Sequence, residues 1–90
     1  DVYSVGANDH FINVSGTAAT KYVVLPSAAS VGRGRMLVIK DGSMNAASHN
    51  IVISSSAAGT KIDNAGSISI TSNSGSVSLV SDGVSQWLVY

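Results

Sequence analysis

Residues 67–80 alternate apolar and hydroxyl side chains in two short runs, SISIT and SVSLV, which Ser-Asn-Ser-Gly separates. A period of two places successive side chains on opposite faces of a β-strand. One face of each run is therefore isoleucine, valine or leucine, and the other is almost entirely serine and threonine. This pattern predicts two strands that each bury one face, and it does not fit the periodicity of a helix.

Similar strand signals recur about every ten residues, with Gly, Asn, Asp and Ser between them. Residues that favour helix interiors are scarce, and glutamate is absent. The spacing predicts one all-β domain over residues 1–90, a small sandwich, barrel or β-prism with one short helical turn between Pro26 and Val31. A β-solenoid is the alternative, because segments 50–63 and 67–80 loosely resemble each other. The expected strands number about nine: 2–5, 10–14, 21–26, 35–40, 50–54, 60–63, 67–71, 76–80 and 86–90.

The alternation also predicts which side chains form the core and where the chain turns. Turns are expected at residues 6–9 and at Asp82-Gly83, and residues 72–75 are expected to close a hairpin between the last two serine-rich strands. Trp87 shares the apolar parity of its strand and is expected in the core. The predicted core face comprises Leu37, Ile39, Ile51, Ile53, Ile62, Ile68, Ile70, Val77, Leu79, Trp87 and Val89.

The composition limits the classes of partner that the chain can have. Five basic and five acidic residues give a net charge of zero, which argues against a nucleic-acid partner. No apolar run approaches the ~20 residues of a membrane span. Charged residues are only 11% of the chain, so much of its surface is expected to be covered in the working state. The chain opens on Asp1 without a methionine, and we expect it to be a fragment or processed piece of a longer protein.

The residues that usually carry catalysis do not form a recognisable pattern. Asp41, Asp63 and Asp82 could pair as carboxylates for glycoside cleavage, but each stands beside Gly, Asn or Ser and is better explained by turn chemistry. His10 and His49 have no partners at metal-ligand spacing, and cysteine is absent. No serine has the neighbours of a nucleophile. The sequence therefore predicts no catalytic residue, no metal ligand and no cofactor.

A small set of residues could contact a ligand. Tyr22 and Tyr90 are not assigned to the core face of their strands and could stack against a sugar, whereas Trp87 is assigned to the core. His49 and Asn45 lie in a polar loop and could contribute hydrogen bonds. Tyr22, Tyr90, His49 and Asn45 are the candidate ligand-contact residues.

The order of several motifs resembles a module of bacteriophage tail-fibre, tailspike and related virion appendage proteins. The segment YVVLPSAASVGRGRMLVIKD (22–41) resembles that module's Leu-Pro strand, small-residue loop and Lys-Asp strand. NIVIS (50–54), KIDNAGSISI (61–70) and NSGSVSLVSDGVSQW (73–87) resemble its later strands and its closing tryptophan. Asn64 stands where the module commonly has glycine, and Ser74 stands where an aromatic residue is common.

The resemblance implies a structural, non-enzymatic module that forms a homotrimer in a virion appendage and is made in the host cytoplasm. Its expected partners are copies of itself and other appendage proteins, and its hydroxyl-rich faces would lie against neighbouring chains or be solvated. The alternative function is a receptor-recognition tip that binds host cell-surface glycan. A small core without disulfides also predicts that the oligomer contributes much of the stability.

Overall fold

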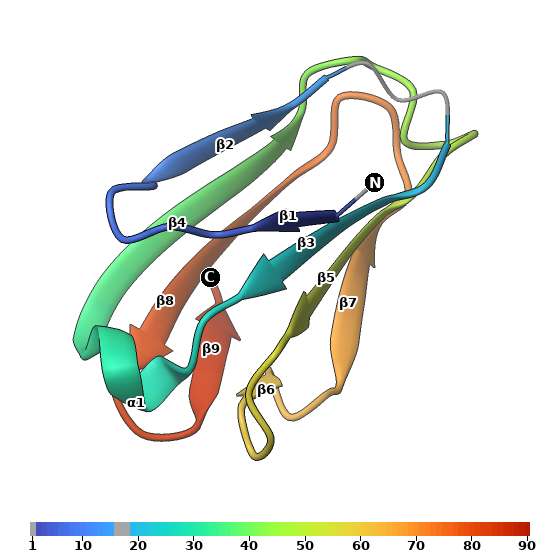
Figure 1. Ribbon diagram of the computed structural model, residues 1–90. Helices are drawn as coiled ribbons and strands as arrows, with labels where there is room; N and C mark the ends of the chain where they lie inside the picture. The colour runs from blue at the N-terminus through green and yellow to red at the C-terminus, as the bar shows by residue number, and fades with distance from the viewer. Residues whose placement is uncertain (1, 16–18) are drawn as a thin grey trace.

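The computed structural model describes residues 2–15 and 19–90, which fold into two β-sheets packed face to face (Figure 1). Nine strands and one helical turn confirm the all-β prediction, and of the three architectures named for it the chain adopts the sandwich. The strands are β1 (Val2–Ser4), β2 (Phe11–Val14), β3 (Lys21–Leu25), β4 (Arg33–Asp41), β5 (Ile51–Ser55), β6 (Lys61–Ile62), β7 (Ser67–Ile70), β8 (Ser76–Asp82) and β9 (Gln86–Val89), with α1 at Ala28–Val31.

Successive strands alternate between the two sheets along most of the chain. Sheet A has the order β1-β3-β5-β7, and sheet B has the order β2-β4-β8-β9-β6. The pairs β1–β3, β3–β5 and β2–β4 are parallel, so the first five strands wind between the sheets as the coils of a solenoid do. The pairs β5–β7, β4–β8 and β8–β9 are antiparallel. The pair β6–β9 is again parallel. The molecule therefore combines solenoid-like winding in its first half with a mainly antiparallel second half.

The residues 72–75 were expected to close a hairpin, and this prediction is wrong. β7 pairs with β5 in sheet A, whereas β8 pairs with β4 and β9 in sheet B. Residues 72–75 therefore form an arch between the sheets, and Gly75 lies tightly inside it, since a Cβ there would come within 2.7 Å of the Ile70 side chain. The predicted turns at 6–9 and at Asp82-Gly83 are confirmed by the Asp9 N–H bond to Gly6 (3.2 Å) and by the antiparallel pairing of β8 with β9.

The core lies between the sheets, and from Leu37 onward it largely follows the predicted alternation. The structure also buries apolar residues that the predicted core face did not include: Ile12, Val14, Val23, Leu25, Ala28 and Ala46. Ile39, Ile51, Ile53, Ile62, Leu37, Leu79 and Trp87 are fully buried, and Ile70 is nearly so. Ile68 and Val77 are half-buried and pack against this cluster. Val89 is the exception: the prediction of a core position is wrong, because β9 ends there at an open side of the sandwich and 38% of Val89 is exposed.

Trp87 joins the core to the crossover between β3 and β4. Its ring is fully buried, and its Nε1 donates a hydrogen bond of 3.0 Å to the carbonyl oxygen of Pro26.

We expect Trp87→Ala to lower the free energy of unfolding by about 3–5 kcal/mol, because removal of a large buried side chain leaves a cavity. Chemical denaturation measures this change. Val84→Ala, at an exposed residue (69%) in the β8–β9 turn, is the control and should stay within about 0.5 kcal/mol of the parent. Equal stability of the two variants would contradict the burial of Trp87.

Candidate functional site

A buried carboxylate organises the loops at one end of the sandwich. Asp41 closes β4 and is fully buried. Its Oδ2 accepts backbone N–H bonds from Asn45 (2.8 Å), Ala46 (2.8 Å) and Ser74 (3.1 Å), and its Oδ1 accepts the Ser43 hydroxyl (2.7 Å). Burial opposes ionisation of Asp41, but these hydrogen bonds outweigh it and lower the pKa to about 2. One ionised side chain therefore ties the β4–β5 loop to the arch between β7 and β8.

The other two aspartates singled out in the sequence also serve turns. Asp82 accepts three backbone N–H bonds from residues 84–86 through Oδ1, at 2.8–3.0 Å, and these bonds lower its pKa. Asp63 accepts one bond from the Val89 N–H at 3.2 Å. Asp63 and Asn64 have φ values of 48° and 69°, a conformation that Asp and Asn tolerate better than most residues. The expectation of turn chemistry is confirmed for Asp41 and Asp82, whose carboxylates bond groups of residues that closely follow them. Asp63 also lies in a turn, but its carboxylate bonds the Val89 N–H of β9.

The four candidate ligand-contact residues lie on three separate parts of the chain. Asn45 and His49 share the β4–β5 loop, where the His49 N–H bonds the Asn45 carbonyl (3.0 Å). Tyr22 lies in β3 and is 44% exposed, and Tyr90 follows β9 and is 62% exposed. Of the four, Tyr22 alone lines a surface hollow of about 490 Å³. The strand parity identified the exposure of Tyr22 and Tyr90, whereas Asn45 and His49 are half-buried, and the structure does not bring the four residues to one place.

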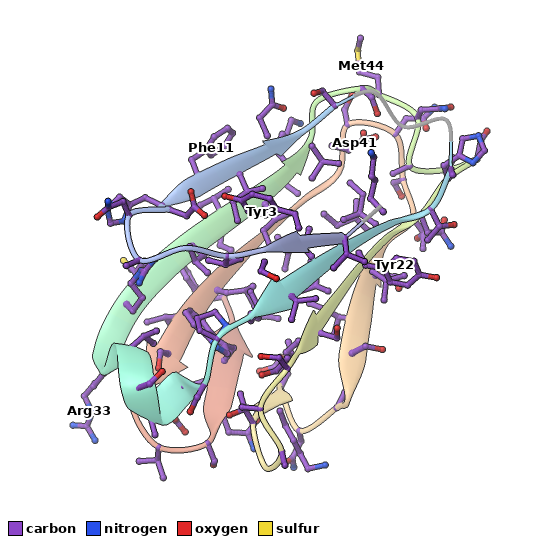
Figure 2. The ribbon with its side chains drawn as sticks, in the orientation of Figure 1. Tyr3, Phe11, Tyr22, Arg33, Asp41 and Met44 are labelled. Atoms are coloured by element: carbon purple, nitrogen blue, oxygen red, sulfur yellow. The ribbon has the colours of Figure 1, made fainter. Side chains whose placement is uncertain are left out.

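The larger hollow, of about 490 Å³, opens between β1 and β2 at one edge of the sandwich. Tyr3 lies in this opening, and its hydroxyl donates a hydrogen bond to Oδ2 of Asp9, which the Gly6 N–H also contacts at 2.8 Å. This bond from the Tyr3 hydroxyl lowers the pKa of Asp9, and the same bond raises the pKa of Tyr3. Figure 2 shows Tyr3 and Phe11 on opposite sides of β2, so the aromatic rings at this edge do not form one platform.

The outward face of sheet A carries no charged side chain. The register places its side chains in two rows across the four strands, and each residue is exposed or half-buried. We call this surface the sheet A face. Its first row is Val2, Tyr22, Val52 and Ser69, and its second row is Ser4, Val24, Ser54 and Ser67.

The outward face of sheet B carries an apolar area that extends over four strands. Phe11 pairs with Val38, Met36 pairs with Val80, and Val80 pairs with Leu88, so the five side chains are contiguous across four strands. Phe11 is 59% exposed, Met36 53% and Leu88 39%. We call these five residues the sheet B patch. The parity of each strand contained the signal, but only the strand order places the residues side by side.

Comparisons with known proteins add no assignment. No protein-family model matches the chain, and no curated protein sequence matches it. Residues 2–15 and 19–90 contain no group of three or more His, Cys, Asp or Glu side chains placed to hold a metal ion. Within the same ranges, no helix is long and apolar enough to cross a membrane. The surfaces themselves therefore carry the functional interpretation.

Asp41 is the residue at this end of the molecule whose ionisation matters most for stability. Its folded-state pKa of about 2 lies below the usual 3.8, so its stabilising contribution is complete above about pH 4 and is lost as the pH falls toward 2. We expect Asp41→Asn to lower the free energy of unfolding at neutral pH by about 1–3 kcal/mol, since the neutral amide accepts the backbone N–H groups more weakly.

The variant should also lose part of the decrease in stability between about pH 4 and pH 2, the remainder coming from Asp9 and Asp82, whose pKa values are also lowered. Urea denaturation across this pH range measures both effects. Asp63→Asn is the control, because Asp63 is exposed and accepts a single long bond. An Asp41→Asn protein as stable as this control at neutral pH would contradict the role of the Asp41 carboxylate.

Proposed function

We propose that this chain is a structural module of a virion appendage, such as a tail fibre or tailspike, and that it works as a homotrimer. The observation that carries the proposal is the sheet A face, whose eight side chains are serine, valine and tyrosine without a single charge. The resemblance of segments 22–41 and 73–87 to phage appendage modules supports the choice of a virion location and of three copies.

Burial at a symmetric axis explains why such a face lacks charges. A charged side chain buried without a partner costs several kcal/mol, whereas serine hydroxyls can bond across the axis and valine can pack. Small side chains also let flat sheets from neighbouring copies approach closely. A solvated outer face would more often carry lysine and glutamate, and glutamate is absent from the chain.

The sheet B patch supports a second contact of the same module. Exposed apolar areas that extend over several strands usually mark interaction sites. Phe11, Met36 and Leu88 would contact another appendage protein once the sheet A face is occupied by copies of the chain. Such a division of surfaces suits a module that has to hold its own copies together and attach to its neighbours.

The hollow beside Tyr3 favours host-glycan recognition as a second candidate function. The hydrogen bond to Asp9 holds the Tyr3 ring at the opening, where it could stack on a sugar while Asn13 and Ser15 on the rim supply polar contacts. Titration with host surface polysaccharide tests this candidate. Binding that survives in the Tyr3→Ala variant would place any glycan site elsewhere.

Homotrimer formation predicts that stability depends on protein concentration. Sedimentation equilibrium of the chain should give a species of about 27 kDa, three times 9.1 kDa, whose melting temperature falls on dilution. Val52→Lys, at the centre of the sheet A face, should dissociate the trimer because it places three lysines at the axis. Leu88→Lys in the sheet B patch is the matched control and should leave the trimer intact. A cooperatively folded 9.1 kDa species at every concentration would refute the assembly proposal.

A further inference from the structure

Sheet A ends in two strands that each have one neighbour. In the described chain, β1 pairs with β3 alone, and at the other edge of the sheet β7 pairs with β5 alone. Edge strands are usually protected by lysine, proline or bulges, because their free N–H and C=O groups attract other strands. The sequences of β1 (Val-Tyr-Ser) and β7 (Ser-Ile-Ser-Ile) contain neither lysine nor proline. Both edges are therefore open to strand addition.

The β1 edge has free backbone hydrogen-bonding groups, and a hollow lies next to it. The Val5 N–H bonds the Val24 carbonyl (2.9 Å), so the alternation of the backbone points the N–H and C=O of Ser4 away from β3. Next to this edge lies the 490 Å³ hollow, whose inner wall includes Tyr3, Ile12 and Val23. An added strand would supply hydrogen bonds to Ser4 and inward side chains to the hollow.

The β7 edge has complementary features in the same chain. Its inward side chains are Ile68 and Ile70, of which Ile68 is half-buried and lines a smaller hollow of about 240 Å³. Its outward side chains, Ser67 and Ser69, are exposed and uncharged. The two edges thus resemble each other on both faces. Their core-side residues are the Tyr3 ring in β1 and two isoleucines in β7, and their residues on the sheet A face are serine or valine.

We infer that β7 of one copy adds to the free edge of β1 in the next copy, so that sheet A continues from copy to copy. This inference rests on the proposed assembly function and specifies the surface that carries it. β1, β3 and β5 are mutually parallel and β7 is antiparallel to β5, so the new pair is antiparallel when the copies share one orientation. The contact joins two different edges, and such a head-to-tail contact closes into a ring when the rotation allows it.

This contact also explains the composition of the sheet A face. In a ring of three copies joined through β1 and β7, the outward rows of sheet A become continuous around the axis. Ser4 and Val2 then lie beside Ser67 and Ser69 of the next copy. The hollow beside β1 then lies next to Ile68 of the neighbouring copy, which is half-buried and points to the core side of sheet A.

Disulfide trapping tests the contact, because the chain contains no cysteine of its own. Ser4→Cys would be mixed with Ser67→Cys or with Ser69→Cys, two variants that cover both outward positions of β7. A head-to-tail contact predicts a disulfide-linked dimer of about 18 kDa, twice 9.1 kDa, in at least one mixture and none in any variant alone. Ser48→Cys, at an exposed position of the β4–β5 loop, is the control partner for Ser4→Cys and should remain unlinked.

A second variant separates this inference from the proposed function. Ser4→Pro removes a donor at the free edge without removing a bond to β3, and it should abolish the trimer in sedimentation while the circular dichroism spectrum stays that of a β-protein. If the parent chain is trimeric but the mixtures do not link, or if Ser4→Cys links to itself, the edge contact is refuted and the assembly function stands. If the parent chain is monomeric at every concentration, both are refuted.

Discussion

The packing of two alternating sheets against each other is the constraint on which the rest of the molecule depends. Each strand has one apolar face, and a short strand cannot bury that face by itself. The chain solves this by sending successive strands to opposite sheets, so that Ile51 and Ile53 in sheet A lie opposite Leu37, Leu79 and Trp87 in sheet B. Burying apolar area at roughly 25 cal/mol per Å² makes this core the main favourable term in folding. The arches and crossovers exist because the chain must change sheets so often.

The polar side chains inside and near the core form hydrogen bonds with the segments in which the chain crosses from one sheet to the other. Asp41 bonds backbone N–H groups from the β4–β5 loop and from the β7–β8 arch, two connections that would otherwise leave donors unpaired. Ser81 is buried and donates its hydroxyl to the Ala28 carbonyl (3.0 Å), which holds α1 against β8. Trp87 donates its Nε1–H to the Pro26 carbonyl, which holds the segment between β3 and α1 against the core. Hydrogen bonds to turns and connections account for the aspartates that stand out in the sequence.

The functional interpretation depends on the outer faces of the two sheets, because the inner faces form the core. The uncharged sheet A face, the two unprotected edges of the same sheet and the sheet B patch are three independent departures from the surface of an ordinary small monomer. The proposed assembly of the module with copies of itself would explain the first two together, and the proposed contact with a neighbouring appendage protein would explain the third. The hydroxyl face of β7 then has a physical purpose, since serine tolerates either burial at an axis or water.

The sequence by itself determined which residues form strands and which side of each strand is apolar, because alternation with a period of two has one structural explanation. It therefore identified the β-class, the buried Trp87 and the core positions of the later strands. It did not name the buried residues of the earlier strands, of α1 and of the β4–β5 loop, which are Ile12, Val14, Val23, Leu25, Ala28 and Ala46. It did not determine which strands are neighbours. Backbone hydrogen bonds are the same for every residue type, and Ser-Asn-Ser-Gly suits an arch between sheets as well as a hairpin within one. The wrong hairpin at 72–75, the exposure of Val89 and the scattered positions of Tyr22, Tyr90, Asn45 and His49 all follow from that limit. Only the tertiary structure decided the strand order, and with it the uncharged sheet A face, the contiguous sheet B patch and the two free edges, since each requires residues far apart in sequence to lie side by side.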